Sequence, residues 1–376
     1  MKITKKLKNS LVFANKANLN KVDVLSYIKN NKLKKKIPKS DIGIYNEIKT
    51  TIIKSNNLPF KFTRQELFYL QNNKQSKWIE YLIYRYKFHN YPKKKIVSSF
   101  PIYLLIELVS ACNLRCVMCF QDDRSFTKKP YMGTMNFELY KKIIDQAVKG
   151  GTKAVTFGSR GEPTLYPKIG DCLDYASNKF IDLKLNTNAT KLNTKLSHQI
   201  LKSSLNELVF SIEADNKDLY EKIRVHGKWE EIIKNIENFN NIKEKFYPNS
   251  KIHTRVSGVI FHKKQNLKKI ENFWKQYVDD VFFVKATERW DTYNNSIKKN
   301  MTHPCLNLWE RMYIWFDGKC NPCDQDYKSY LKVGEIDVKK NFSIKKVWHS
   351  EKYRKLRKTH LNKGRLNYFP CDRCGF

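Results

Sequence analysis

The feature that most constrains the fold of this chain is an alternation of apolar runs and amphipathic segments between residues 101 and 285. Six apolar runs are predicted as strands: 101–108, 153–157, 181–185, 207–212, 252–261 and 281–285. The segments between them have helical periodicity, as over 137–148, where Asn136 is the expected N-cap. Strands that alternate with helices predict an α/β fold with a parallel sheet and right-handed crossovers. Such a sheet carries its functional loops at the carboxyl ends of its strands.

A basic, helix-patterned extension over residues 1–98 precedes the sheet. Ile44, Ile48 and Ile52 recur at a spacing of four, which predicts one buried helical face. Thr63 and Glu66 have the spacing of a capping box. The helix that this box opens is predicted to carry Leu67, Leu70, Trp78 and Tyr81. A linker is expected at 91–95. We expect a small helical cap on the sheet domain, with a substrate-recruiting module as the alternative.

The tail of the chain, from residue 301, differs from the middle. Apolar residues 312–316, the Asp317–Gly318 pair and residues 319–321 predict a β-hairpin. A short strand is expected at 333–336 and a basic helix over 343–360. The sequence therefore predicts three parts: the extension 1–98, the sheet domain 99–300 and a small α+β domain 301–376.

The net charge of +36 comes from 72 Lys and Arg against 36 Asp and Glu. Such a charge suits an anionic partner, whether nucleic acid, a phosphorylated small molecule or a membrane surface. The alternative, which we prefer, is compositional drift, because the charge is spread along the chain and no base-reading module is present.

The location expected from the sequence is cytoplasmic. No apolar run reaches the length of about 18 residues that a membrane span needs, and residues 1–20 lack a secretory pattern. Seven of the nine cysteines fall into two spaced groups. In a reducing compartment such spacing favours metal binding over disulfides.

The first cysteine group follows the first predicted strand. Cys112, Cys116 and Cys119 have the spacing C-x3-C-x2-C. Three thiolates on one short loop can bind three irons of a [4Fe–4S] cluster and leave the fourth iron open to another ligand. The alternatives are a structural zinc site, for which no fourth ligand follows directly, and a chance group of core cysteines.

This triplet, followed by the aromatic Phe120, resembles the signature of the radical S-adenosylmethionine (AdoMet) superfamily. The resemblance implies a partial (β/α)6 TIM-like barrel in which AdoMet chelates the open iron of the [4Fe–4S] cluster. It also implies reductive cleavage of AdoMet to a 5′-deoxyadenosyl radical that abstracts hydrogen from a substrate C–H bond. An electron donor such as flavodoxin or ferredoxin is then required.

The resemblance extends to the loops after the later strands. The cofactor-binding residues it implies are Phe120, Gly161, Glu162, Pro163, Thr187, Asn188, Ser211, Glu213 and Arg224. In this family the Glu162 loop receives the methionine amino group, and Arg224 would neutralise the carboxylate. Each of these residues is ambiguous when taken alone, because Glu162 could instead cap a helix and Arg224 could instead lie on a solvated face. The chain departs from the family at Arg160, where a glycine is usual, and at Ala189, which stands in the place of another glycine.

The second cysteine group lies in the tail. Cys305, Cys323, Cys371 and Cys374 would make a closed four-cysteine site, with Cys320 as the rival to Cys323. Four thiolates suit structural zinc as well as iron. The segment resembles the SPASM/Twitch extension of the radical AdoMet superfamily, in its single-cluster form, which implies an auxiliary [4Fe–4S] cluster. Cys172 is then expected to be a core residue.

Asp324 directly follows Cys323 and is the candidate catalytic base; the alternative is an Asp that hydrogen-bonds its own loop. In the similar anaerobic sulfatase maturases, an Asp at that place takes the substrate proton. The tail also resembles that of the butirosin-pathway dehydrogenase. These resemblances imply a small-molecule oxidoreductase acting on a sugar, polyol or aminocyclitol, and an anionic substrate would suit the basic surface. The alternatives are a peptide- or protein-modifying maturase, an RNA-modifying relative, and a basic nucleic-acid-binding protein with structural zinc.

Overall fold

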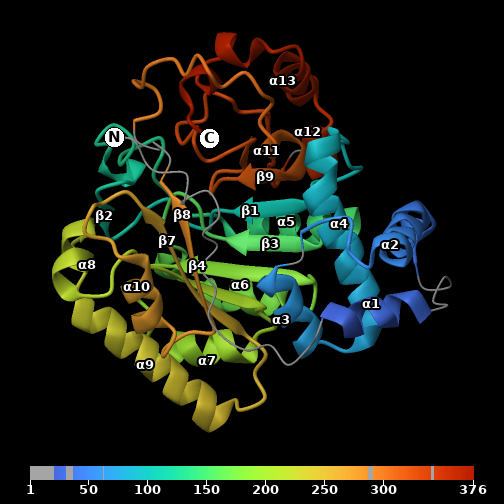
Figure 1. The fold of residues 1–376 in the computed structure, drawn as a ribbon. Coiled ribbons are helices and arrows are strands. Elements are labelled where there is room, and N and C mark those ends of the chain that lie inside the picture. The colour runs from blue at the N-terminus through green and yellow to red at the C-terminus, as the bar shows by residue number, and fades with distance from the viewer. Residues whose placement is uncertain (1–20, 31–36, 62, 287–290, 340–342) are drawn as a thin grey trace.

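The computed structural model describes residues 21–30, 37–61, 63–286, 291–339 and 343–376 (Figure 1). Its centre is a nine-stranded sheet with the order β11-β10-β9-β1-β3-β4-β5-β7-β8. Six consecutive members of that order pair in parallel. They are β1 (Tyr103–Ile106), β3 (Ala154–Phe157), β4 (Asp182–Thr187), β5 (Glu207–Ser211), β7 (His253–Ile260) and β8 (Asp280–Lys285). The predicted α/β fold with a partial (β/α)6 barrel is confirmed.

Helices on the outside of the sheet join these strands (Figure 1). They are α5 (Phe137–Gly150), α6 (Ile169–Ala176), α7 (Thr194–Lys202), α8 (Lys217–Ile223), α9 (Trp229–Phe246) and α10 (Leu267–Trp274). As expected, the Asn136 side chain caps α5 by accepting the amide hydrogens of Glu138 and Leu139, at 2.8 and 3.3 Å. All four residues of β3 are buried, as is typical of a parallel strand covered on both faces.

The C-terminal segment continues the sheet of the barrel. It contains α11 (Asn307–Glu310), β9 (Arg311–Ile314), β10 (Lys319–Asn321), β11 (Gly334–Glu335), α12 (Ile344–Trp348) and α13 (Glu351–Leu361). The expected hairpin turns at Gly318, whose φ of +83° favours glycine. β9 pairs in parallel with β1, from Tyr103 opposite Arg311 to Ile106 opposite Ile314. The single helix predicted over 343–360 is wrong: it is broken at His349, and Ser350 caps α13 through a 3.2 Å bond from the Tyr353 amide.

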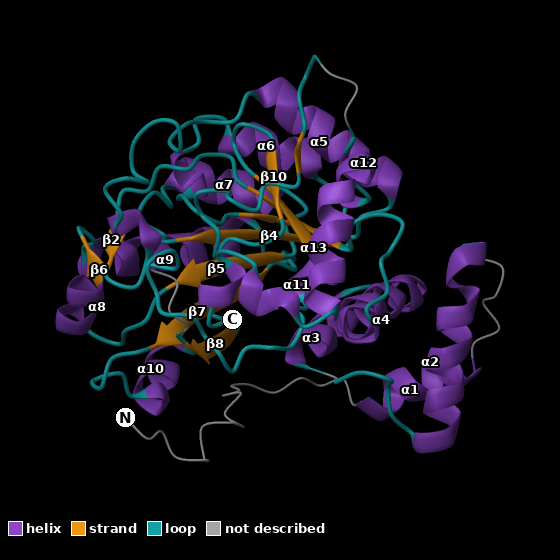
Figure 2. Cartoon of the chain, turned by 90° about the horizontal axis from the view of Figure 1, so that it is seen from above, coloured by secondary structure: helices purple, strands orange, loops and turns teal. Residues whose placement is uncertain are grey.

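The N-terminal extension is helical in its described residues, with α1 (Lys21–Asn30), α2 (Ile42–Ser55), α3 (Arg64–Asn72) and α4 (Trp78–Lys94). Ile44, Ile48 and Ile52 are buried on one face of α2, and Thr63 and Glu66 form the expected capping box. Figure 2 shows α1 and α2 to one side of the barrel. The expected cap is therefore a helical body of its own, with its own apolar cluster that reaches Ile102 and Ala154 of the barrel.

Two expectations for the extension are wrong. The helix opened by the capping box ends at Asn72, because Asn73 takes an extended conformation, and Trp78 and Tyr81 belong to α4. Residues 91–94 continue α4 instead of forming a linker. Pro92 is tolerated there because it lies in the last turn, where the loss of one backbone donor interrupts little of the helix.

Short elements complete the description. Single 3-10 turns are Lys39–Asp41, Gln75–Lys77, Phe120–Asp122, Pro163–Leu165, Gly364–Asn367 and Cys371–Arg373. β2 (Arg115–Cys116) and β6 (Arg224–Val225) form a separate two-stranded antiparallel sheet. Within the described residues, we find no helix with both the length and the apolar character to cross a membrane.

Candidate active site at the carboxyl ends of the barrel strands

A cavity of about 570 Å³ lies where the barrel strands end. Its walls include Cys112, Cys116 and Cys119 from the loop after β1, and Asp324 from the C-terminal segment. The strand ends contribute Gly158, Asn186, Ser211, Ser257 and Val284. The parallel arrangement explains this meeting, since all six strands finish at one edge of the sheet.

The three cysteines lie on a loop that the small β2–β6 sheet holds in place. Cys116 is opposite Arg224 in that sheet, and the Cys119 amide donates to the Cys116 carbonyl at 2.9 Å. Burial raises the pKa of Cys112 to about 12 and the pKa of Cys116 to about 11, and the neighbouring cysteines add to both shifts. Three thiolates here need a positive centre to balance them. The irons of a cluster supply that charge, so this donor set fits a [4Fe–4S] cluster.

Glu162 ties the second strand-end loop to the third. Its carboxylate accepts hydrogen bonds from the Thr187 hydroxyl and the Asn188 amide, both at 2.7 Å. It also accepts the Thr164 amide at 3.1 Å and so caps the turn that begins at Pro163. Burial raises the pKa of Glu162, although these hydrogen bonds oppose the shift. The carboxylate therefore serves both as a cap and as part of the cavity wall.

Gly161 brings this loop into contact with the cysteine loop. A Cβ atom at Gly161 would lie 2.2 Å from the Val109 carbonyl oxygen and 2.6 Å from that of Ala111. The next amide, of Glu162, donates to the Ala111 carbonyl at 2.9 Å. Only glycine permits this backbone approach.

Arg224 is not on a solvated face. It is buried and forms a two-pronged pair with Glu213, in which Nε and Nη2 each lie 2.6 Å from a carboxylate oxygen. Its Nη1 donates toward the Cys116 sulfur at 3.6 Å. Burial acts to lower the pKa of Arg224, but the Cys116 and Glu213 charges raise it well above its ordinary value. Arg224 thus places a permanent positive charge beside the cysteine loop.

The remaining residues predicted for the cofactor differ in their placement. Thr187, Asn188, Ser211 and Glu213 line the cavity. Phe120 does not line it, because its ring stacks on Tyr327 with centroids 4.7 Å apart. Ala189 has a φ of +64°, the conformation that the glycine usual at this place adopts freely.

Among the residues that the structure describes, three buried polar atoms in the cavity wall have no hydrogen-bond partner: Gln121 Oε1, Ser159 Oγ and Asn186 Oδ1. Buried polar groups in proteins are nearly always satisfied, so unpaired ones that line a cavity mark places for ligand atoms. Sequence reasoning did not identify any of these three residues. The available signal was the place of Asn186, directly before the predicted cofactor residue Thr187 at the carboxyl end of β4.

The second cysteine group comes together from three parts of the tail. Cys323 lies near Cys305, Cys371 and Cys374, since their charges, with burial as the larger cause, raise its pKa well above the ordinary value. Arg365 donates to the carbonyls of Cys371 and Cys374 at 3.3 and 3.2 Å and so orders the terminal loop. Four half-buried cysteines, whose thiolates would repel one another, again fit a cationic centre.

Cys320 lies apart from this group. It is fully buried, and its sulfur donates toward the Gly318 carbonyl at 3.6 Å. Burial, together with the charges of Glu335 and Asp317, raises the pKa of its thiol, and Lys332 opposes this shift. Cys172 is a core residue of α6, as expected. In the described part of the chain no three His, Cys, Asp or Glu side chains gather closely enough to hold a single metal ion.

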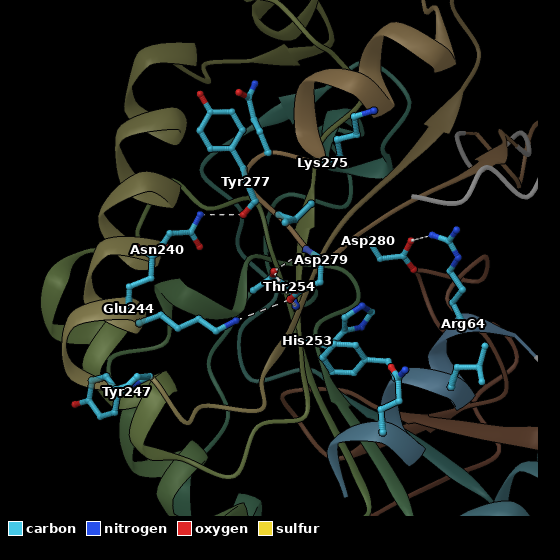
Figure 3. A pocket seen from close by; sticks show the side chains of 17 residues that line it. Arg64, Asn240, Glu244, Tyr247, His253, Thr254, Lys275, Tyr277, Asp279 and Asp280 are labelled. Atoms are coloured by element: carbon cyan, nitrogen blue, oxygen red, sulfur yellow. Dashed lines mark hydrogen bonds and ion pairs between the residues drawn. The ribbon is translucent and has the colours of Figure 1, made fainter. Parts of the chain in front are cut away.

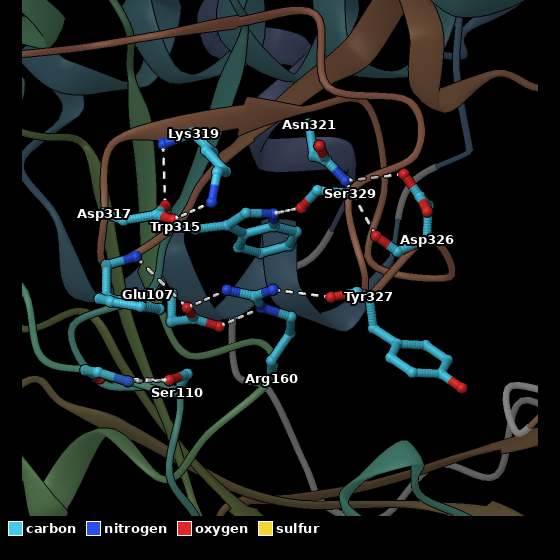
Figure 4. A network of polar contacts seen from close by, with 12 residues as sticks. Glu107, Ser110, Arg160, Trp315, Asp317, Lys319, Asn321, Asp326, Tyr327 and Ser329 are labelled. Carbon is cyan, nitrogen blue, oxygen red and sulfur yellow. Dashed lines mark hydrogen bonds and ion pairs between the residues drawn. The ribbon is translucent and has the colours of Figure 1, made fainter. Parts of the chain in front are cut away.

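Arg160 joins the barrel to the C-terminal segment (Figure 4). Its guanidinium makes two 2.6 Å bonds to the Glu107 carboxylate and a third, of 2.7 Å, to the Tyr327 carbonyl. The same group lies 4.1 Å from the centre of the Trp315 ring. Among the described residues, positive φ values in this loop fall on Gly158 and Ser159 and not on Arg160. The loop therefore accommodates an arginine where the family has a glycine.

A larger hollow of about 1090 Å³ lies at the opposite ends of β7 and β8 (Figure 3). Two ion pairs lie in its wall, with Arg64 at 4.0 Å from Asp280 and Lys243 at 3.9 Å from Asp279. None of the residues found to line it is a cysteine or a predicted site residue. The chemistry predicted from the sequence therefore belongs to the smaller cavity.

Fold and cavity define a partial-barrel enzyme with two cysteine centres. Residues 106–276 match the family model of the radical SAM superfamily, and residues 305–375 match that of the SPASM iron-sulfur cluster-binding domain. The chain belongs to the radical SAM superfamily and carries a C-terminal SPASM domain. Its cofactors are accordingly AdoMet, the [4Fe–4S] cluster that binds it and an auxiliary cluster.

Two curated relatives and one solved structure illustrate the likeness. The chain is 32% identical over 112 residues to the tungsten-containing aldehyde ferredoxin oxidoreductase cofactor-modifying protein of Pyrococcus furiosus, a match of 30% of each chain. It is 25% identical over 234 residues to the mycofactocin maturase MftC of Mycolicibacterium smegmatis, covering 61% of this chain and 56% of that one. The chain thus spans less than two thirds of either relative.

The solved structure of anSMEcpe with bound AdoMet has a TM-score of 0.53 and 16% identity, and the match covers 69% of this chain and 83% of that one. At this identity the likeness shows the fold.

Proposed function

We propose that the protein oxidises a small hydroxylated molecule, such as a sugar, polyol or aminocyclitol, to the carbonyl compound. The observation that carries this proposal is the position of Asp324. It follows Cys323 of the second cysteine group and lies on the wall of the cavity that Cys112, Cys116 and Cys119 also line. One cavity therefore offers a site for hydrogen abstraction and a carboxylate for the proton.

In this proposal Cys112, Cys116 and Cys119 hold the AdoMet-binding cluster, and Glu162, Thr187, Asn188, Ser211, Glu213 and Arg224 surround the cofactor. When bound, the cofactor supplies a 5′-deoxyadenosyl radical that takes a hydrogen atom from carbon. The paired Arg224 keeps a positive charge beside Cys116. Gln121, Ser159 and Asn186 contribute their unpaired atoms as hydrogen-bond partners for bound groups.

The substrate gives up three particles in this reaction. One hydrogen atom leaves the carbinol carbon for the AdoMet-derived radical, and the hydroxyl proton goes to the Asp324 carboxylate. Cys305, Cys323, Cys371 and Cys374 would hold the auxiliary cluster, which would accept the remaining electron. The carbinol becomes a carbonyl, so atoms and electrons balance.

The size of the cavity supports a small substrate. Its volume of about 570 Å³ has to hold part of a cluster and AdoMet as well. What is left suits a molecule of sugar size or one side chain inserted from outside.

The test is Asp324→Asn, with Asp317→Asn as the matched control. Asp317 lies in the same segment, but it pairs with Lys319 in the hairpin turn, away from the cavity. Anaerobic assays with carbinol-deuterated myo-inositol, glucose and glucose 1-phosphate should move deuterium into 5′-deoxyadenosine. Asp324→Asn should still cleave AdoMet but lower carbonyl product about a hundredfold or more, while Asp317→Asn behaves as wild type. Product formation unchanged in Asp324→Asn would refute the assignment.

A second candidate function is the modification of a peptide. The match to MftC over 61% of this chain favours it, since that relative is a maturase. Against it, the described residues of the extension are helices, and no strand of a peptide-binding sheet is found among them. A peptide encoded beside this gene, incubated with the enzyme and AdoMet, should change mass if this candidate is right.

A further inference from the structure

The helix α13 presents a strongly basic outer face. Its inward side chains, Tyr353, Leu356, Arg357 and His360, are buried. On the outer side, Lys352, Arg354, Lys355 and Lys358 are basic and exposed, and the uncharged Thr359 and Leu361 follow in the last turn. The exposed Lys345 of α12 adds to this surface. We call these five residues the α13 basic face.

The exposed residues of α9, by contrast, mix both signs of charge and include Glu230, Glu231, Lys234 and Glu237. On α13 the one acid is Glu351, in the first turn. In the described part of the chain, Lys352, Arg354, Lys355 and Lys358 pair with no acid, because none of the ion pairs found includes them. The α13 basic face is thus a local excess of positive charge without paired acids.

The buried side of α13 packs on the second cysteine group. Burial raises the pKa of the Tyr353 hydroxyl, and Cys323, Cys305 and Cys320 lie near enough to add to this shift. His360 accepts a hydrogen bond from the Cys305 amide at 3.2 Å, through Nδ1. Arg357 donates to the Leu308 carbonyl at 2.8 Å, beside α11. Only the thickness of one helix, about 10 Å, therefore separates the α13 basic face from the auxiliary centre.

We propose that the α13 basic face docks an acidic one-electron carrier protein, which removes the electron that substrate oxidation leaves on the auxiliary cluster. The cluster is oxidised by one electron and the carrier is reduced by one, so the exchange balances. Opposite charges steer such encounters and orient the partners. This docking proposal requires the auxiliary cluster, but it does not depend on the role of Asp324 or on the identity of the substrate.

The test uses the holoenzyme and an acidic flavodoxin as the probe. Lys352→Glu/Lys355→Glu/Lys358→Glu reverses three charges on the face, and Lys195→Glu/Lys202→Glu/Lys234→Glu is the matched control. The control lysines are exposed on α7 and α9, which lie at the bottom of Figure 1 while α13 lies at the top. Both variants change the net charge by the same amount.

Chemically reduced enzyme, freed of reductant, is mixed with oxidised flavodoxin, and the flavin semiquinone is followed by stopped flow. Because this measurement needs no substrate, its outcome is independent of the proposed oxidation. The α13 variant should transfer electrons at least about tenfold more slowly than wild type, and the control within about twofold of wild type. Flavodoxin binding, measured directly by interferometry, should weaken in parallel, and added salt should slow wild type more than the α13 variant.

Equal slowing in both variants, or none in the α13 variant, would overturn the proposal. So would a loss of single-stranded RNA binding in the α13 variant with unchanged electron transfer, because the face would then bind nucleic acid. If the reversed variant loses iron, Lys352→Gln/Lys355→Gln/Lys358→Gln replaces it, with an intermediate slowing expected.

Discussion

Replacement of Arg160 by Met should destabilise the junction between the barrel and the C-terminal segment. Glu107 and Arg160 have side chains that are only 1% and 2% exposed, and two 2.6 Å hydrogen bonds join them. Without the guanidinium, the Glu107 carboxylate keeps one contact, the Phe316 amide at 3.3 Å. The Tyr327 carbonyl also loses its 2.7 Å donor.

The expected loss follows from the burial of the pair. Removing one partner of a buried ion pair costs about 3–5 kcal/mol, because the other charge stays buried without compensation. Replacing both partners by apolar side chains of similar volume costs far less. Arg160→Met/Glu107→Leu should therefore be more stable than Arg160→Met alone. Lys217→Met, which breaks an exposed pair with Glu230, is the control and should change little.

The assay is guanidinium unfolding of the anaerobically purified holoenzyme, followed by tryptophan fluorescence. Trp315 stacks on Arg160, so its emission reports on this junction. A double variant as unstable as the sum of its two single variants would refute the reasoning, since the two residues would then not act as a pair. So would an Arg160→Met variant with the stability of Lys217→Met.

Three further predictions concern the cysteine groups, the cofactor loop and the extension. Cys323→Ser should lose about half of the bound iron, as expected when one of two clusters is lost. Cys320→Ser should keep its full iron content, because Cys320 lies apart from the second cysteine group. Iron analysis of both purified variants measures the difference. Gly161→Ala should weaken AdoMet binding about tenfold or more by calorimetry, because the new methyl would overlap the Val109 carbonyl; unchanged binding would contradict the loop geometry. Burial acts to raise the pKa of Glu66, but hydrogen bonds from His89 and Thr63 and the Arg85 charge lower it to about 2. Its contribution to stability is therefore present above the unfolded pKa of about 4.3 and lost as the pH falls toward 2. Glu66→Gln should flatten this acid loss in urea midpoints measured from pH 7 to pH 2.

The periodic parts of the sequence predicted the fold well. Between residues 101 and 285, each strand and each amphipathic helix can be recognised from the hydrophobic period of its own residues. The same holds for Asn136 and for the Thr63–Glu66 box, whose caps form as expected. What failed were junctions, such as the break at His349 and the helical residues 91–94, since ends of elements depend on tertiary contacts.

Contacts between segments that are far apart in the chain could not be predicted from the sequence. The pairing of β9 with β1 joins residues about two hundred positions apart, and nothing in either strand specifies its neighbour. In the sequence, Arg160 was only a residue at a place where the family usually has a glycine. Its hydrogen bonds to the buried Glu107 carboxylate and to the Tyr327 carbonyl are visible only in the structure. Ala189 has a left-handed backbone, with a φ of +64°, which the alanine itself does not indicate because glycine adopts this conformation far more readily.

Cys112, Cys116 and Cys119 should leave one iron of the cluster open for AdoMet. Mössbauer spectroscopy of ⁵⁷Fe-labelled Cys371→Ala protein, which should retain only the cluster on Cys112, Cys116 and Cys119, tests it most directly. Added AdoMet should shift the signal of one iron in four, as that iron gains nitrogen and oxygen ligands. Superimposable spectra with and without AdoMet would contradict the claim.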